Sequence, residues 1–168
     1  SYGEVVFNNS MTGYQEMLTD PSYAGQIVMP TYPLIGNYGI NDEDSESSRI
    51  QVAGFVVREH CMFPSHGLSK KSLNDFLVEQ GVVGISQVDT RAVTRKLRTK
   101  GVMMGTITTE ENSKEISKRL ASAPSYSQID FVQRVSTTDV YKWDRSGNSS
   151  PESKGLILVT DCGLKYNI

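Results

Sequence analysis

The amino-acid sequence predicts an α/β fold, in which helices and strands are mixed around one sheet without strict alternation. Amphipathic helical patterns and short strand-like runs support this prediction. The composition agrees, because hydrophobic residues make up 38% of the chain and charged residues 21%, as in ordinary globular proteins. With 168 residues, the chain has room for one domain, or for one domain and part of a second.

The expected strands are short, beginning with the run around Val5–Phe7. A short amphipathic turn follows the first strand and is flanked by loops at residues 10–16 and 19–23. A polar run at residues 41–49, rich in carboxylates, is expected to be an exposed acidic loop. The strands of the first domain are expected at residues 4–8, 26–31, 52–58, 82–86 and 104–108.

The helix expected over Ser72–Gln80 has an apolar face made of Leu73, Phe76 and Leu77. Gly81 follows where a C-terminal cap belongs, because glycine adopts the left-handed backbone that ends many helices at little steric cost. A further helix is expected over residues 113–122.

The next helix along the chain after residue 81 is expected from Asp89 to Lys100. Asp89 can cap its first turn, Gly101 marks its end, and Val93 and Leu97 share its buried face. Cations crowd its last turns, a distribution that the helix dipole favours. These cations are Arg95, Lys96, Arg98 and Lys100. Together with Arg91 they could bind an anion or a partner, or form only a solvated face.

The last quarter of the sequence indicates a domain boundary. Residues 144–154 contain no hydrophobic side chain and are interpreted as a linker, so the first domain is expected to cover residues 1–143. Leu156–Thr160 is a continuous apolar run typical of a buried strand, and a turn-like stretch follows it. We therefore expect residues 155–168 to be the truncated start of a second, α/β-type domain, and both ends of the sequence to be cut.

Charge and cysteine content exclude several function classes. The net charge is −2, so there is no electrostatic sign of nucleic-acid binding. No apolar run approaches the roughly 20 residues that cross a bilayer, and no signal-peptide pattern opens the chain, so no membrane association is expected. The two cysteines, Cys61 and Cys162, are too few for a disulfide framework, and a cytoplasmic setting is expected.

A catalytic or metal site at the cysteines has weak support. His60 adjoins Cys61 and His66 is nearby, which could in principle activate a thiolate for a small hydrolase. No oxyanion-hole motif accompanies them, and the spacing fits none of the usual zinc patterns. A surface loop is therefore favoured for residues 61–67, a packing role for Cys162, and no metal or cofactor is expected in this chain.

The loops rich in Gly, Pro, Asn and Tyr are more informative. Residues 10–16, 19–23 and 32–39 are stretches that hold backbone amides and small polar groups in tight geometry. Asp20 and Ser22 on either side of Pro21 predict a rigid turn that exposes a hydroxyl. Such loops indicate a binding surface, or plain structural turns, rather than catalysis.

These loops also carry a resemblance to a known family. The stretches at residues 3–8, 11–23, 31–39 and 84–98 resemble signatures of the small subunit of carbamoyl-phosphate synthetase, and Val135–Thr137 is similar to a weaker one. Residues 161–167 are similar to the first turn of that family's glutaminase domain. The resemblance covers essentially the whole chain.

The resemblance implies an N-terminal domain of β/β/α type followed by a class I glutamine amidotransferase domain. In this family a Cys–His–Glu triad releases ammonia from glutamine. The ammonia passes to a large subunit, which uses ATP, Mg²⁺ and bicarbonate to make carbamoyl phosphate for arginine and pyrimidine synthesis. The N-terminal domain docks the large subunit, giving a heterodimer, and the serine that matches Ser22 contacts the substrate glutamine.

The chain departs from the family pattern in one respect. The nucleophile motif Gly-x-Cys-Leu-Gly-His does not occur, and neither Cys61 nor Cys162 matches it. We therefore expect no catalytic residue in this chain and no glutaminase activity from it alone. Two alternatives to a separate small subunit stay open. The chain could be part of a polypeptide in which the small and large regions are fused, or it could be a stand-alone protein-interaction module.

Overall fold

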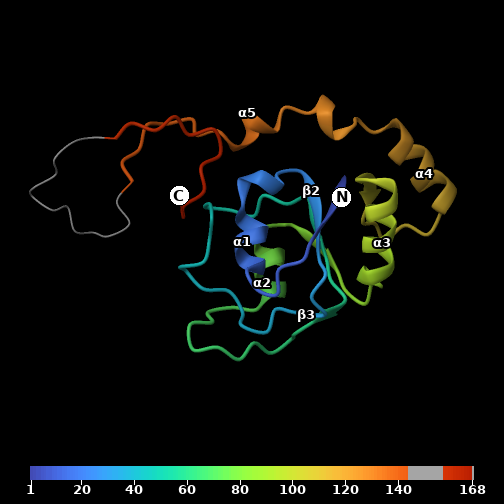
Figure 1. The fold of residues 1–168 in the computed structure, drawn as a ribbon, viewed down its shortest axis with the longest axis horizontal. Helices are drawn as coiled ribbons and strands as arrows, with labels where there is room; N and C mark the ends of the chain where they lie inside the picture. Colours follow the sequence, from blue (N-terminus) through green and yellow to red (C-terminus); the bar gives the residue numbers. More distant parts are fainter. Residues whose placement is uncertain (144–156, 168) are drawn as a thin grey trace, which may run out of the picture.

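A mixed, five-stranded sheet lies at the centre of the computed structural model, which describes residues 1–143 and 157–167 (Figure 1). The strand order is β6-β4-β2-β1-β7, in which β7 alone is antiparallel to its neighbour. A separate pair of short parallel strands forms a second sheet below the first. The strands are β1 (Tyr2–Asn8), β2 (Gln26–Pro30), β3 (Leu34–Ile35), β4 (Gly54–Val56), β5 (Glu59–His60), β6 (Val83–Ile85) and β7 (Met103–Thr106).

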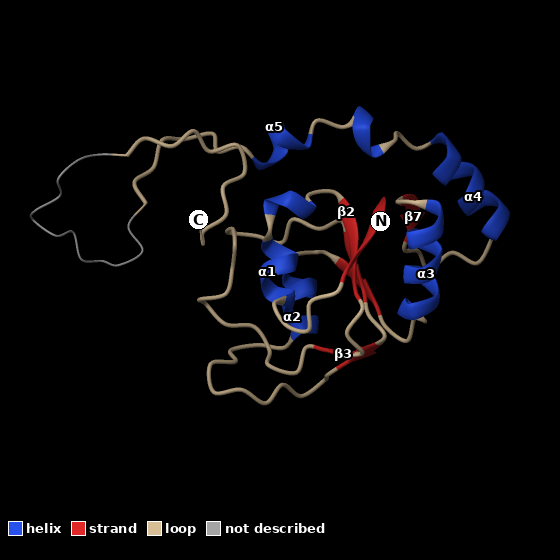
Figure 2. Ribbon diagram, viewed as in Figure 1, coloured by secondary structure: helices blue, strands red, loops and turns tan. Residues whose placement is uncertain are grey.

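Helices cover both faces of the sheet (Figure 2). The helices α1 (Tyr14–Thr19) and α2 (Leu73–Glu79) lie on one side, and α3 (Thr90–Lys100) lies on the other. The helix α4 (Ser113–Ser122) packs against β7. Three shorter segments complete the described part: the 3₁₀ turns η1 (Pro21–Tyr23) and η2 (Tyr126–Gln128), and the helix α5 (Phe131–Val135).

The alternation of side chains along β2 divides the core into two clusters. Val28 points into the cluster formed with α1 and α2, whereas Ile27 and Met29 point into the cluster covered by Leu97 of α3. Burial on both faces explains why β2 is an uninterrupted apolar run. This arrangement confirms the predicted α/β class. It also places the turn after α1 directly before β2, at the edge of the sheet where Glu4 of β1 pairs with Gln26.

Local signals predicted the helix ends well. Asp89 accepts a hydrogen bond from the Ala92 N–H, which confirms it as the cap of α3. Gly81 has a left-handed backbone, with φ of 66°, directly after α2. The helix expected over residues 113–122 is confirmed with the same bounds.

Two expectations about elements were wrong. The run at residues 52–58 is a strand only over Gly54–Val56. Residues 157–160 form no strand, and Ile157 and Leu158 are 88% exposed. A strand of this apolar type needs hydrogen-bonded neighbours on both sides, and no described strand pairs with it. Leu156 and the expected linker at residues 144–154 lie outside the described residues.

Candidate functional site

The predicted turn around Ser22 follows directly from the end of α1. The Asp20 N–H closes the helix by donating to the Glu16 carbonyl over 2.8 Å. The Asp20 carboxylate then caps the following turn, because its Oδ1 accepts a hydrogen bond of 2.8 Å from the Ser22 N–H. Pro21 occupies the first position of that turn, where its fixed φ suits the geometry and its missing N–H costs nothing.

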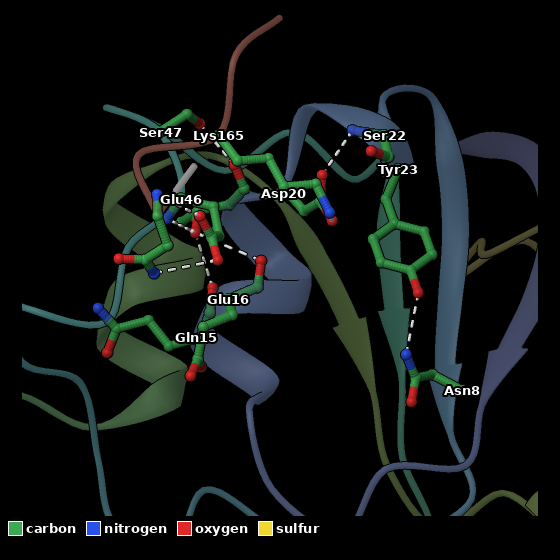
Figure 3. A network of polar contacts seen from close by, with 11 residues as sticks. Asn8, Gln15, Glu16, Asp20, Ser22, Tyr23, Glu46, Ser47 and Lys165 are labelled. Carbon is green, nitrogen blue, oxygen red and sulfur yellow. Dashed lines mark hydrogen bonds and ion pairs between the residues drawn. The ribbon is translucent and has the colours of Figure 1, made fainter.

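Two more contacts anchor the turn after Ser22, and Figure 3 shows the one at Tyr23. The Tyr23 hydroxyl accepts a hydrogen bond of 2.9 Å from Asn8 Nδ2 at the end of β1. The Ala24 carbonyl accepts one of 3.1 Å from the Tyr126 hydroxyl. Ser22 itself is exposed, and its hydroxyl bonds to no other residue in the described ranges. The structure thus confirms the predicted turn, in which the Ser22 hydroxyl is exposed to solvent.

The C-terminal segment, residues 161–167, returns to this turn. Lys165 Nζ lies 2.7 Å from Asp20 Oδ2, and this bond raises the pKa of the lysine. Asp20 is only 8% exposed, so the pair is shielded from water on the carboxylate side. Both oxygens of Asp20 therefore have partners, one within the turn and one from the far end of the sequence.

Glu46 holds the same C-terminal segment through three contacts. Its carbonyl accepts a hydrogen bond of 3.0 Å from the Tyr166 N–H. Its carboxylate accepts two from Asn167, at 3.2 Å from the backbone N–H and 3.1 Å from Nδ2. The Glu46 N–H donates to Thr19 Oγ1 of α1 over 2.8 Å, which ties these contacts to the helix that precedes the turn.

The expectation that residues 41–49 are simply an exposed acidic loop was wrong. Asn41 and Ser47 are buried, and both bond to α1. Gln15 of α1 lies wholly within the core beside Asn41, and Ser47 Oγ donates to the Thr19 carbonyl. Gln15 Nε2 donates to the Asn41 carbonyl at 2.7 Å and to Ser45 Oγ at 2.9 Å, and Gln15 Oε1 accepts from the Asn41 N–H at 2.9 Å. The segment is therefore pinned to α1.

A tight turn at Asp161 forms the start of the C-terminal segment. Asp161 Oδ1 accepts hydrogen bonds from Leu164 N–H at 2.7 Å and from Gly163 N–H at 2.9 Å, and these bonds lower the pKa of the carboxyl. Gly163 has a φ of 103°, and a Cβ there would lie 3.2 Å from Pro21 Cβ. The backbone of this turn thus packs directly against the Ser22 turn. A polar cleft of about 340 Å³ runs between the two turns and α5.

The cysteine and histidine candidates do not converge. Cys61 Sγ bonds to the Phe63 carbonyl at 3.3 Å, and His66 Nδ1 accepts from the Leu68 N–H at 3.3 Å. Across residues 1–143 and 157–167, no group of three or more His, Cys, Asp or Glu side chains is placed to hold a metal ion. Nor does any helix in those ranges have the length and apolar character needed to cross a membrane. The basic residues of α3 are exposed and form no ion pair with another described residue.

Comparison with known proteins decides the family. The model of the carbamoyl-phosphate synthase small chain, CPSase domain, matches residues 1–107, which include β1 to β7 and the Ser22 turn. The chain belongs to the carbamoyl-phosphate synthase small-chain family. The resemblance seen in the sequence is thereby confirmed.

Relatives in this family align with almost the whole chain. The chain is 49% identical to the carbamoyl phosphate synthase small chain of Aquifex aeolicus over 175 residues, covering 99% of this chain and 47% of that protein. It is 50% identical to that of a Nostoc species over 177 residues, covering 99% and 46%. The chain thus spans about half the length of the curated small chains it matches.

Sequence reasoning predicted the turn at Ser22 and the capping role of Asp20, but it missed three residues whose contacts surround this turn. Gln15, Glu46 and Lys165 contact partners that are more than 20 residues away along the chain. Lys165 was visible only as part of the stretch at residues 161–167. No local pattern assigns its ammonium to Asp20.

Proposed function

We propose that the chain is the N-terminal part of a glutamine-dependent carbamoyl-phosphate synthetase small subunit, and that its Ser22 turn forms one wall of the glutamine site. The family membership, together with an exposed hydroxyl on a turn fixed at both ends, supports this proposal. A hydroxyl both donates and accepts hydrogen bonds, so it can bind either the amide or the carboxylate of glutamine.

In this proposal the rest of the reaction takes place outside the chain. The nucleophile motif of the family does not occur in the 168 residues, so glutamine hydrolysis depends on the remaining part of the small subunit. The large subunit is the docking partner, and it binds the ATP and Mg²⁺ that convert bicarbonate and ammonia to carbamoyl phosphate. The complex is expected to work in the cytoplasm.

The test is Ser22→Ala in the complete small subunit assembled with its large subunit, assayed with glutamine and with free ammonia. A neutral hydrogen bond contributes about 0.5–1.5 kcal/mol, so the apparent KM for glutamine should rise several-fold to about tenfold. Synthesis from ammonia should be unchanged, because free ammonia bypasses the glutamine site.

Ser65→Ala is a matched control, since Ser65 is also exposed but lies in the loop before α2. It should leave both activities unchanged. Equal losses with glutamine and ammonia for Ser22→Ala would assign the turn to folding or docking. An unchanged KM for glutamine would show that Ser22 is only a turn residue.

A further inference from the structure

We propose that Lys165 is a positioning residue for Ser22, and that it acts through the shared carboxylate of Asp20. This inference rests on the proposed contact between Ser22 and glutamine, and it names the residue that keeps that contact in place. Figure 3 shows Asp20 at the C-terminal end of α1, with Lys165 on one side of it and Ser22 on the other.

The Asp20 carboxylate joins two parts of the protein. Oδ1 accepts the Ser22 N–H at 2.8 Å, and Oδ2 lies 2.7 Å from the Lys165 ammonium. A largely buried carboxylate is stable only while its charge is compensated. Without the ammonium, the carboxylate would lose its compensating charge and would rotate toward water. This rotation weakens its bond to the Ser22 N–H and frees the backbone that carries the hydroxyl.

Lys165 is itself held in place on both sides, so it can fix the position of Asp20. On the C-terminal side, Tyr166 and Asn167 bond to Glu46. On the N-terminal side, the left-handed Gly163 lies so close to Pro21 and Val135 that a Cβ there would be 2.6 Å from Val135 Cγ2. The lysine backbone is thus fixed relative to the turn before its ammonium reaches Asp20.

The other contacts of the turn do not replace this one. Asn8 bonds to the Tyr23 hydroxyl, and Tyr126 bonds to the Ala24 carbonyl. Both of these contacts are made by residues that follow Ser22 in the chain. Asp20 is the residue that bonds the Ser22 backbone itself. Loss of Lys165 should therefore shift the position of Ser22, while the turn itself still forms.

The test is Lys165→Met in the complete small subunit with its large subunit, assayed with both nitrogen donors. The apparent KM for glutamine should rise by about three- to tenfold, while synthesis from ammonia stays unchanged. Lys165→Arg keeps the charge and should hold the KM within about twofold of the parent. Lys142→Met is the matched control, because Lys142 is exposed, forms no ion pair with another described residue and should have no effect.

A double substitution separates this inference from the proposed function. If Lys165 acts through Ser22, then Lys165→Met should add little to the KM already raised by Ser22→Ala. If the two changes multiply, or if Lys165→Met leaves the KM unchanged while Ser22→Ala raises it, the positioning role is wrong although the function stands. Equal losses with glutamine and ammonia would also overturn it. An unchanged KM in Ser22→Ala would overturn the proposed function itself.

Discussion

Replacing Gln15 with methionine tests whether the buried amide of α1 holds residues 41–49 in place. Gln15 is completely buried, and its two polar atoms bond to both the N–H and the carbonyl of Asn41, which is 7% exposed. Methionine has a similar length and fills the same space, so the substitution removes the hydrogen bonds without opening a cavity.

The magnitude follows from the groups that lose their partners. An unpaired buried donor or acceptor costs about 1–3 kcal/mol, and the two backbone groups of Asn41 are both affected. Partial exposure of the segment and the apolar contacts of methionine offset some of this cost. We expect the free energy of unfolding to fall by about 2–4 kcal/mol.

Urea unfolding of the 168-residue chain, followed by circular dichroism, measures this change. Gln133→Met is the control, because Gln133 is exposed on α5, and it should alter stability by less than about 0.5 kcal/mol. Hydrogen exchange at the Asn41 amide should also accelerate. A loss in Gln15→Met no larger than that of the control would refute the reasoning that this amide supports the segment.

Three further predictions concern pH and close packing. Burial raises the pKa of Tyr14, so the stability that its neutral form contributes should be complete below about pH 10 and fall as pH rises above it. Urea midpoints measured against pH should fall less steeply in Tyr14→Phe, and midpoints that do not depend on pH would contradict this. Gly25→Ala should displace α5, because Gly25 has a φ of 73° and a Cβ there would lie 2.0 Å from Phe131 Cε1. Proteolysis within residues 126–135 should become faster, and an unchanged cleavage rate would count against this prediction. Hydrogen bonds, first from the Leu164 N–H and next from the Tyr141 hydroxyl, lower the pKa of Asp161, so its stabilisation should be present above about pH 4 and be lost as pH falls further. NMR shifts at Leu164 measure this titration, and titration at an ordinary pKa would contradict the prediction.

The sequence by itself determined the elements whose signals lie within a few residues of one another. Asp89 and Gly101 mark the ends of α3 because capping and left-handed glycine act locally. The turn at Asp20 was predictable for the same reason, since its carboxylate bonds to an amide two residues later. Family-specific stretches such as residues 11–23 added the expected role of Ser22, which local chemistry alone left open.

Only the tertiary structure decided what surrounds that turn. The carboxylate-rich residues 41–49 have the composition of a solvated loop, but packing of α1 against them buries Gln15 and Asn41. The apolar run after Leu156 has the composition of a buried strand, yet Ile157 is exposed because no described strand pairs with it. The Lys165–Asp20 pair also depends on contacts between distant parts of the chain. Hydrophobic pattern and propensity encode what a residue prefers, whereas its partner is set by which segments the fold brings together.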